Sequence, residues 1–291
     1  MSADPSVHKR IGVTGLKGFL GGEVATELRQ AGHLVCDLDP WCRHRDAESL
    51  RDLPAQLDWV LHFAARTSIE QSRLDPKGFL RDNLAATQNA AQVAVERGAA
   101  LLYLSSYVYG QPQYNPVDEL HPTSELNPYM ASKLAGEKWL QNALPDLPVV
   151  VLRPFSVYGR QRQPGRLVSD LLECVRAGRP LAIADATPQR DHLYSRDFCA
   201  LAQAIVTTAP VATGVYNVGS GVANSNLEVA ELLAELAGET RPVAVLSQPR
   251  PNDVPLCIAD LRKVHAAFGW SPHWSLRAGL AELVAALGPN R

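Results

Sequence analysis

Tyr129 and Lys133 stand four residues apart, so a helix through this segment carries a phenol and an ammonium on one face. A free tyrosine, with a pKa of about 10, is a poor base at neutral pH. A cation fixed at about 4 Å, at an effective dielectric constant of about 20, stabilises the phenolate by roughly 4 kcal/mol, or about three pKa units. The pair predicts proton exchange with a substrate hydroxyl near neutral pH, and a solvent-facing pair is the alternative.

A hydroxyl group stands at the end of a predicted strand in the same half of the chain. The apolar run 101–104 leads directly into Ser105 and Ser106. In an open parallel sheet the carboxyl ends of the strands border the cleft where ligands bind. We therefore expect a serine hydroxyl beside the cleft that Tyr129 faces.

Three glycines follow the first predicted strand, residues 10–14, and open the first helix. Gly15, Gly18 and Gly21 allow a tight turn, a close approach of pyrophosphate to the backbone, and close packing of helix on strand. The helix N-terminus adds N–H groups that lack partners and a positive dipole end. These glycines, with Phe19 and Leu20 between them, are predicted to bind a dinucleotide; a flexible glycine loop is the alternative.

Asp39 follows the second predicted strand, where a carboxylate can accept hydrogen bonds from the ribose hydroxyls of a dinucleotide. This position favours NAD, because a 2′-phosphate beside a carboxylate would suffer like-charge repulsion. Arg43, His44 and Arg45 follow closely and would offset that repulsion, so NADP stays an alternative. A turn-forming residue before Pro40 is the other reading of Asp39.

Short apolar runs alternate with helical patterns through the first half of the chain. The runs predicted as strands buried on both faces are residues 10–14, 34–38, 59–63, 101–104 and 149–152. The segments predicted as helices are residues 19–31, 47–53, 79–97 and 129–143. This order predicts an α/β fold with a Rossmann-like, doubly wound parallel sheet.

The pattern changes after Pro154, where the elements become shorter and Gly and Pro more frequent. We expect residues 1–153 to form mainly an NAD(P)-binding Rossmann domain. Residues 154–291 are expected to form mainly a smaller C-terminal substrate-binding lobe, with segments that return to the Rossmann sheet. Ligands would then bind in a cleft between the two parts.

Composition excludes several classes of protein. The 291 residues carry a formal net charge of −2, so no basic surplus is present to neutralise a nucleic acid backbone. The 5 cysteines form no C-x-x-C pair, so we predict neither a disulfide framework nor a metal site. No apolar stretch reaches the roughly 18 residues of a membrane span, and a cytoplasmic location is expected.

Further motifs stand in a fixed order along the chain. They are Thr14-Gly15-x-x-Gly18-x-x-Gly21, His62-Phe63-Ala64-Ala65, Asn83, Ser105 ahead of Val108-Tyr109-Gly110, Tyr129-x-x-x-Lys133, and Arg153-Pro154-Phe155-Ser156-Val157-Tyr158-Gly159. Together they resemble the extended short-chain dehydrogenase/reductases, in the group of nucleotide-sugar epimerases and 4-keto-sugar reductases. The resemblance covers most of the chain.

The resemblance implies roles for the catalytic residues. Tyr129 would be the acid or base, and Lys133 would hold the nicotinamide ribose and lower the pKa of the phenol. Ser105, three positions before Val108, would orient the reacting oxygen, with Ser106 as the alternative.

The resemblance also implies residues that contact the cofactor. Asn83 would position Lys133, with a purely structural asparagine as the alternative. Phe63, Ala64 and Ala65 would line the dinucleotide, because small side chains let it lie against the sheet.

Substrate contacts are implied in the second half of the chain. Arg190 and Arg250 would bind phosphate oxygens, for which guanidinium groups are well suited, and exposed ion pairs are the alternative. Asp253 would accept from a ribose hydroxyl. Ser68 and Ser156 complete the expected substrate contacts, although Ser156 stands where epimerases often have asparagine.

The implied activity is NAD(P)-dependent hydride transfer at C4, or a neighbouring carbon, of a nucleotide-diphosphate sugar. An epimerase and a keto-sugar reductase both fit. A dehydratase is disfavoured because Ser106-Tyr107 replaces the acidic residue such enzymes carry, while the short stretch 39–57 resembles the reductases. A non-catalytic dinucleotide sensor or scaffold, and an alcohol or hydroxysteroid dehydrogenase, remain alternatives. A homodimer through the helical segments 79–97 and 139–143 is a further expectation.

Overall fold

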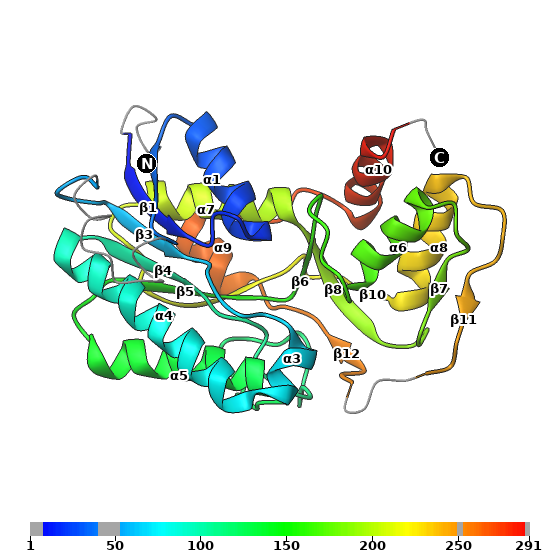
Figure 1. Ribbon diagram of the computed structural model, residues 1–291, viewed down its shortest axis with the longest axis horizontal. Helices are drawn as coiled ribbons and strands as arrows, with labels where there is room; N and C mark the ends of the chain where they lie inside the picture. The colour runs from blue at the N-terminus through cyan, green and yellow to red at the C-terminus, as the bar shows by residue number, and fades with distance from the viewer. Residues whose placement is uncertain (1–7, 40–52, 249–252, 289–291) are drawn as a thin grey trace.

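A six-stranded parallel sheet runs through the larger part of the molecule (Figure 1). The structure is a computed structural model that describes residues 8–39, 53–248 and 253–288. The strands of this sheet are β1 (Arg10–Thr14), β2 (Leu34–Asp37), β3 (Trp59–His62), β4 (Ala100–Leu104), β5 (Val149–Pro154) and β9 (Gly214–Val218). Their order is β2-β1-β3-β4-β5-β9, with every neighbouring pair parallel. The α/β, Rossmann-like class predicted from the sequence is confirmed.

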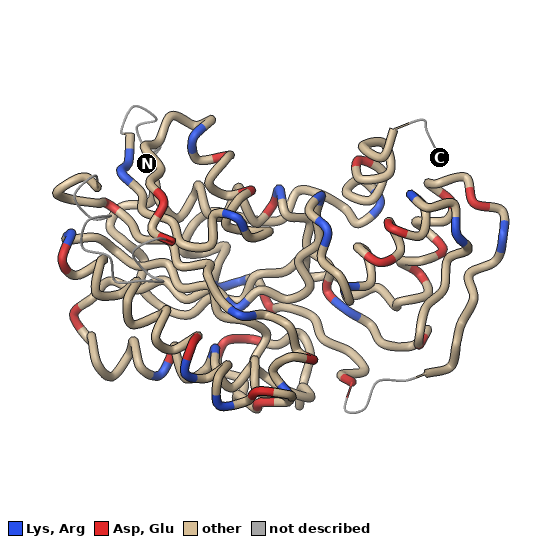
Figure 2. Tube along the Cα trace, viewed as in Figure 1, with Lys and Arg blue, Asp and Glu red and all other residues tan. Residues whose placement is uncertain are grey.

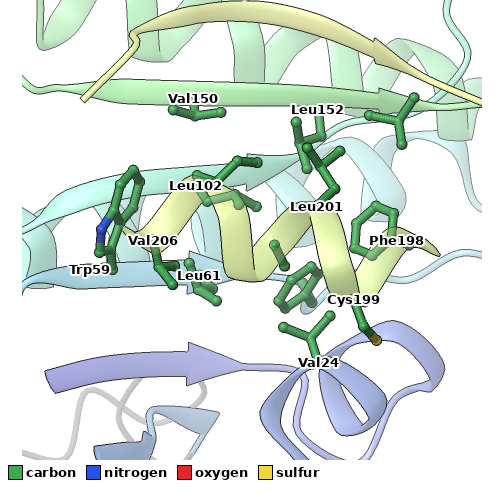
Figure 3. Packing of buried hydrophobic residues seen from close by; sticks show 14 of the residues in the cluster. Val24, Trp59, Leu61, Leu102, Val150, Leu152, Phe198, Cys199, Leu201 and Val206 are labelled. Atoms are coloured by element: carbon green, nitrogen blue, oxygen red, sulfur yellow. The ribbon is translucent and has the colours of Figure 1, made fainter. Parts of the chain in front are cut away.

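Helices cover both faces of this sheet. One face is packed by α1 (Phe19–Gln30), α7 (Ser195–Thr207) and α9 (Arg262–Phe268), and the other by α4 (Pro76–Arg97) and α5 (Pro128–Ala143), with α3 (Ile69–Leu74) beside them. Figure 3 shows Phe198, Leu201 and Val206 of α7 against Leu61 and Leu102 of the sheet. Full burial of such a side chain contributes about 2 kcal/mol, so this layer holds α7 on the strands.

A smaller part with its own core lies beside the larger one (Figure 1). Its strands are β6 (Ser156–Tyr158), β7 (Ala182–Ile183), β8 (Gln189–Tyr194), β10 (Ala223–Ser225), β11 (Ala244–Val245) and β12 (Leu256–Cys257). Its helices are α6 (Leu167–Arg176), α8 (Asn226–Ala237) and α10 (Leu276–Ala286). β8 is the central strand, because it pairs with β6, β10 and β12. Residues of the second half also return to the larger part as α7, β9 and α9.

Most of the predicted elements occur in the structure with small shifts at their ends. One expectation about burial is wrong: β2 is not buried on both faces, and the side chain of Leu34 is 52% exposed. The reason is its place at the edge of the sheet, where β1 is its one partner strand among the residues that the structure describes. The helix predicted at 47–53 lies almost entirely outside the described residues.

Two further observations concern the distribution of charge and the length of the helices. Lys and Arg are interspersed with Asp and Glu in both parts of the molecule, as Figure 2 shows. Among the described residues, no helix is long and apolar enough to cross a membrane.

Candidate functional site

The glycine loop adopts a conformation that requires glycine. Gly15 has a φ of +78°, and a Cβ built there would lie 2.8 Å from the backbone nitrogen of Ala64. A Cβ on Gly21 would collide with the carbonyl oxygen of Gly15. Gly18 is the N-cap of α1 and provides no capping side chain, so N–H groups of the first helical turn stay available to a ligand oxygen. This cradle fits the pyrophosphate of a dinucleotide.

Asp39 lies against the same loop. Its carboxylate accepts hydrogen bonds from the backbone nitrogens of Gly15 at 2.6 Å and Leu16 at 3.2 Å. On the other side of the loop, Thr14 Oγ1 accepts from the backbone nitrogen of Ala64 at 3.1 Å. The structure thus brings Asp39, the loop and the segment carrying Ala64 together, while Arg43, His44 and Arg45 lie outside the described residues.

The N-terminal end of α5 positions the phenol of Tyr129. Asn127 caps this helix by accepting from the backbone nitrogen of Met130 at 2.9 Å, and Pro128 occupies its first turn. Burial raises the pKa of the Tyr129 phenol, while the Arg166 guanidinium and a hydrogen bond with Ser106 act in the opposite direction. The structure therefore brings the hydroxyls of Tyr129 and Ser106 together.

Ser105 does not stand beside the phenol in this structure. Its side chain is 1% exposed, and its hydroxyl donates to a carboxylate oxygen of Glu137. In this structure the Ser105 hydroxyl is therefore engaged by Glu137, and its expected role at the reacting oxygen stays a prediction. Both serines reach α5, but at different heights: Ser105 meets Glu137, two helical turns along from Tyr129, and Ser106 meets Tyr129 itself.

Lys133 lies one helical turn after Tyr129 on α5, and its side chain is almost completely buried. Its Nζ stands 4.6 Å from the ring centroid of Tyr103. Burial lowers the pKa of Lys133 to about 7, and the carboxylate of Glu137 acts against this decrease. The cation that lowers the pKa of Tyr129 in this structure is Arg166 rather than Lys133, which differs from our expectation.

Asn83 connects α4 to α5 through Ser132 rather than through Lys133. Its amide donates to Ser132 Oγ at 2.8 Å and to the carbonyl of Arg66 at 3.1 Å, and its carbonyl accepts from the backbone nitrogen of Arg66 at 2.8 Å. Ser132 Oγ in turn donates to the carbonyl of Tyr129 at 2.7 Å. Asn83 therefore fixes the turn of α5 that carries Tyr129 and Lys133.

His62 lies in a buried polar cluster next to the glycine loop. Its Nδ1 is 2.8 Å from Thr14 Oγ1, and its Nε2 is 3.3 Å from Thr87 Oγ1. Burial, with a smaller contribution from the charge of Lys133, lowers the pKa of His62 to about 3, so the imidazole is neutral at pH 7. The ring therefore fixes β1, β3 and α4 through hydrogen bonds without adding a second cation beside Lys133.

Two of the predicted substrate residues meet in the smaller part. Arg190 on β8 forms an ion pair with Asp253, and both side chains are partly buried. The Arg190 charge also acts on the phenol of Tyr107, which follows Ser106, so this pair stands near the carboxyl end of β4. Arg250 lies outside the described residues.

The two predicted substrate serines have separate places. Ser156 lies on β6 and pairs with His192 of β8. Ser68 caps α3, where its hydroxyl accepts from the backbone nitrogen of Gln71 at 3.2 Å. Among the described residues, no side-chain hydrogen bond joins either serine to Arg190 or Asp253.

Three charged residues near the site were not assigned roles from the sequence. They are Glu137, Arg153 and Arg166. A signal for Glu137 was present, because it continues the four-residue spacing of Tyr129 and Lys133 and so lies on their helix face. Arg166 comes near Tyr129 only through the fold of the segment before α6, so no local pattern points to it.

Asp191, next to Arg190, joins three segments around the site. Its buried carboxylate accepts from Ser220 N at 2.5 Å, Ser220 Oγ at 2.7 Å, Gly221 N at 2.9 Å and Ala259 N at 3.1 Å.

Asp191→Asn would turn an amide N–H₂ toward these donors, so we expect the free energy of unfolding to fall by about 2 kcal/mol. Urea denaturation measures this, with the exposed Asp146→Asn as control; equal stability of both variants would contradict it.

Comparison with known proteins identifies the family. The sequence pattern of the NAD dependent epimerase/dehydratase family matches residues 11–219. A UDP-glucose 4-epimerase from Mycolicibacterium smegmatis is 29% identical over 306 residues, covering 94% of this chain and 96% of that protein.

Two solved structures have the same fold over almost their whole length. The protein RMD from Pseudomonas aeruginosa, complexed with NADPH, has a TM-score of 0.84 and 28% identity, covering 96% of this chain and 98% of that one. A UDP-glucose 4-epimerase from Thermus thermophilus in complex with NAD has a TM-score of 0.84 and 26% identity, with the same coverage. The NAD dependence of the family confirms the nicotinamide cofactor predicted from the glycine loop. This chain belongs to the NAD dependent epimerase/dehydratase family.

Proposed function

We propose that this protein transfers hydride between a nicotinamide cofactor and C4, or a neighbouring carbon, of a nucleotide-diphosphate sugar, as an epimerase or a keto-sugar reductase. The observation that supports this most is the position of Tyr129 at the start of α5, next to Ser106 and one helical turn from the buried Lys133. A protein that only sensed the dinucleotide would have no use for this arrangement. The nucleotide sugars named for its relatives supply the substrate class.

In this proposal Tyr129 moves the proton of the substrate. Its phenol accepts the hydroxyl proton when the sugar carbon is oxidised, and returns a proton when the carbonyl is reduced. Ser106 hydrogen-bonds the same substrate oxygen and so fixes its direction toward the phenol. Ser105, which we expected in this role, would instead hold the segment after β4 in place through its hydrogen bond to Glu137.

Other residues hold the two ligands. Bound NAD supplies the acceptor and donor of the hydride. The glycine loop, with Phe19 and Leu20, would bind its pyrophosphate, and Asp39 its adenine ribose. Phe63, Ala64 and Ala65 would lie along it, and Lys133 would donate to the nicotinamide ribose. A buried ammonium with a pKa near 7 is suited to this, because ribose oxygens would replace the water it has lost.

The smaller part would bind the nucleotide diphosphate. Arg190 and Arg250 would pair with phosphate oxygens, and Asp253 would exchange its ion pair with Arg190 for a ribose hydroxyl. Ser68 and Ser156 stay predicted contacts of the sugar and the diphosphate. The homodimer also stays a prediction.

The test begins with the ligands that accompany the purified protein. Mass spectrometry of the denatured protein identifies any retained NAD, NADP or nucleotide sugar, and turnover is then measured on UDP-, GDP- and dTDP-sugars and their 4-keto forms. Epimerisation without added cofactor supports the epimerase, and stoichiometric NADPH consumption supports the reductase. Oxidation of simple alcohols or steroids, with all nucleotide sugars left unchanged, would refute the proposal.

The two serines give a direct test of the site assignment. We expect Ser106→Ala to lower kcat by about 100-fold, because the substrate oxygen loses a donor that acts in the transition state. Ser105→Ala should change kcat by less than about tenfold and instead lower the free energy of unfolding by roughly 1 kcal/mol, since it breaks a buried hydrogen bond. Steady-state kinetics and urea denaturation measure both. A larger loss of kcat in Ser105→Ala than in Ser106→Ala would assign the hydrogen bond with the substrate oxygen to Ser105.

A further inference from the structure

A buried ion pair lies directly behind the proposed catalytic residues. Glu137 of α5 and Arg153 of β5 each have a side chain that is 7% exposed. The guanidinium donates twice to the carboxylate, from Nε to Oε1 at 3.1 Å and from Nη2 to Oε2 at 2.6 Å. Burying such a pair costs desolvation energy that its attraction often does no more than offset, so a gain in stability does not explain it well.

The pair holds the segment after β4 at two points. Ser105 donates its hydroxyl to Glu137, and Arg153 Nη1 donates to the hydroxyl of Tyr109 at 2.9 Å. Tyr109 in turn donates to Asn217 Oδ1 on β9 at 2.6 Å. Ser106 lies between these two fixed points, so the direction of its hydroxyl toward Tyr129 depends on both.

The same carboxylate acts on Lys133. Glu137 comes four residues after Lys133 on α5, and its negative charge raises the pKa of the ammonium against the effect of burial. The other titratable groups that face Lys133 are His62 from β3, which is neutral, and Tyr103 from β4. Among these groups, Glu137 is the one whose negative charge favours the protonated lysine at neutral pH.

We propose that the Glu137–Arg153 pair is the positioning device of the active site: it fixes Ser106 against Tyr129 and holds a carboxylate one helical turn from Lys133. This inference rests on the proposed function for its effect on turnover. Its effect on Lys133 itself does not depend on which substrate the protein uses. Neither residue touches the reacting atoms in this scheme.

The experiment separates positioning from simple structural support. Glu137→Gln leaves Arg153 buried without its partner and should be strongly destabilised. The double variant Glu137→Gln/Arg153→Met removes both charges, and should recover most of the thermal stability because no buried charge is left unpaired. We expect its kcat to stay about 100-fold below that of the unmodified protein. Recovery of kcat together with stability would show a structural role and overturn the proposal.

A second readout follows the charge of Lys133 without turnover. NMR of ¹³C-labelled lysine side chains, assigned with Lys133→Met, measures its pKa in the protein and in the double variant. Loss of the Glu137 charge should lower this pKa by about one unit or more, and the alkaline limb of the kcat profile should move down with it. Glu235→Gln, in the exposed pair with Arg277, is the matched control and should move neither.

The outcomes keep the two proposals apart. If the unmodified protein binds NAD but converts no nucleotide sugar, while the pKa of Lys133 falls in the double variant, then the proposed function fails and the effect of the pair on Lys133 stands. If nucleotide sugars are converted and neither the pKa nor kcat differs in the double variant, then the positioning proposal fails alone.

Discussion

Tyr129→Phe is expected to lower kcat by about 1,000-fold while NAD binding changes little. The substitution removes only the phenolic oxygen, so the ring still packs at the start of α5. Without that oxygen the substrate has no positioned group with which to exchange its proton, and general acid–base catalysis contributes on the order of 100- to 10,000-fold. Steady-state kinetics on the identified nucleotide sugar, with calorimetric titration of NAD, measures both quantities.

The control for this variant is Tyr114→Phe. The hydroxyl of Tyr114 bonds to Asp118 at 2.8 Å on the exposed surface, so its loss should leave kcat and NAD affinity as they are. A Tyr129→Phe protein that retains more than about a tenth of the activity would show that another group carries the proton.

Lys133→Met is expected to produce a protein that is more stable and almost inactive. The lysine side chain is 2% exposed, and its pKa falls from 10.5 to about 7 in the folded state. Each pKa unit corresponds to about 1.4 kcal/mol, so burial of the ammonium costs on the order of a few kcal/mol. Methionine fills similar volume without charge, and after loss of the contact with the Tyr103 ring we expect a net gain of about 2 kcal/mol.

The stability gained by Lys133→Met should decrease as the pH rises. Below about pH 7 the ammonium is charged in both the folded and the unfolded chain, and the full cost of burial is present. As the pH rises from about 7 toward 10.5, the folded chain loses its proton first, so the unfolded chain binds more protons and the stability of the unmodified protein increases. The advantage of Lys133→Met should therefore shrink with rising pH.

Denaturation in urea from pH 6 to 9 measures this difference, and kinetics measures the loss of activity. We expect kcat to fall by about 1,000-fold and the Kd for NAD to rise, because the nicotinamide ribose loses its donor. Greater stability with unchanged activity would remove Lys133 from the site. Lower stability at pH 6 would contradict the cost of burial described here.

The glycine loop and most of the sheet could be predicted because their causes are local. Gly15 needs a positive φ and close contact with the segment at Ala64, and only glycine allows this. The strands of the first half can be recognised in the sequence as apolar runs, because helices cover both faces of the sheet. Tyr129 and Lys133 could be paired from spacing alone, since the helix sets the geometry.

Other features depend on contacts between distant segments. The edge position of β2, which leaves Leu34 exposed, follows from strand order and not from its apolar composition. The choice between Ser105 and Ser106 depends on which turn of α5 each serine meets, Glu137 for one and Tyr129 for the other, and counting positions from Val108 does not reveal that. Arg166 acts on Tyr129 across a separation that no local pattern encodes.

The pKa of Tyr129 also depends on contacts that the local sequence does not reveal. Spacing predicted that Lys133 would lower it, whereas in the structure burial raises it and the ammonium faces the ring of Tyr103. Burial is a property of the whole fold, so its effect on either residue could not be obtained from the helix alone.

A crystal structure of the protein with bound NAD tests the central claim most directly. We predict that the nicotinamide ring will lie at the carboxyl ends of β4 and β5, with the phenolic oxygen of Tyr129 and the hydroxyl of Ser106 directed at the space beside its C4 atom. Lys133 should reach the ribose of the same nucleotide. A dinucleotide bound elsewhere, or a phenol turned away from the nicotinamide, would contradict this account.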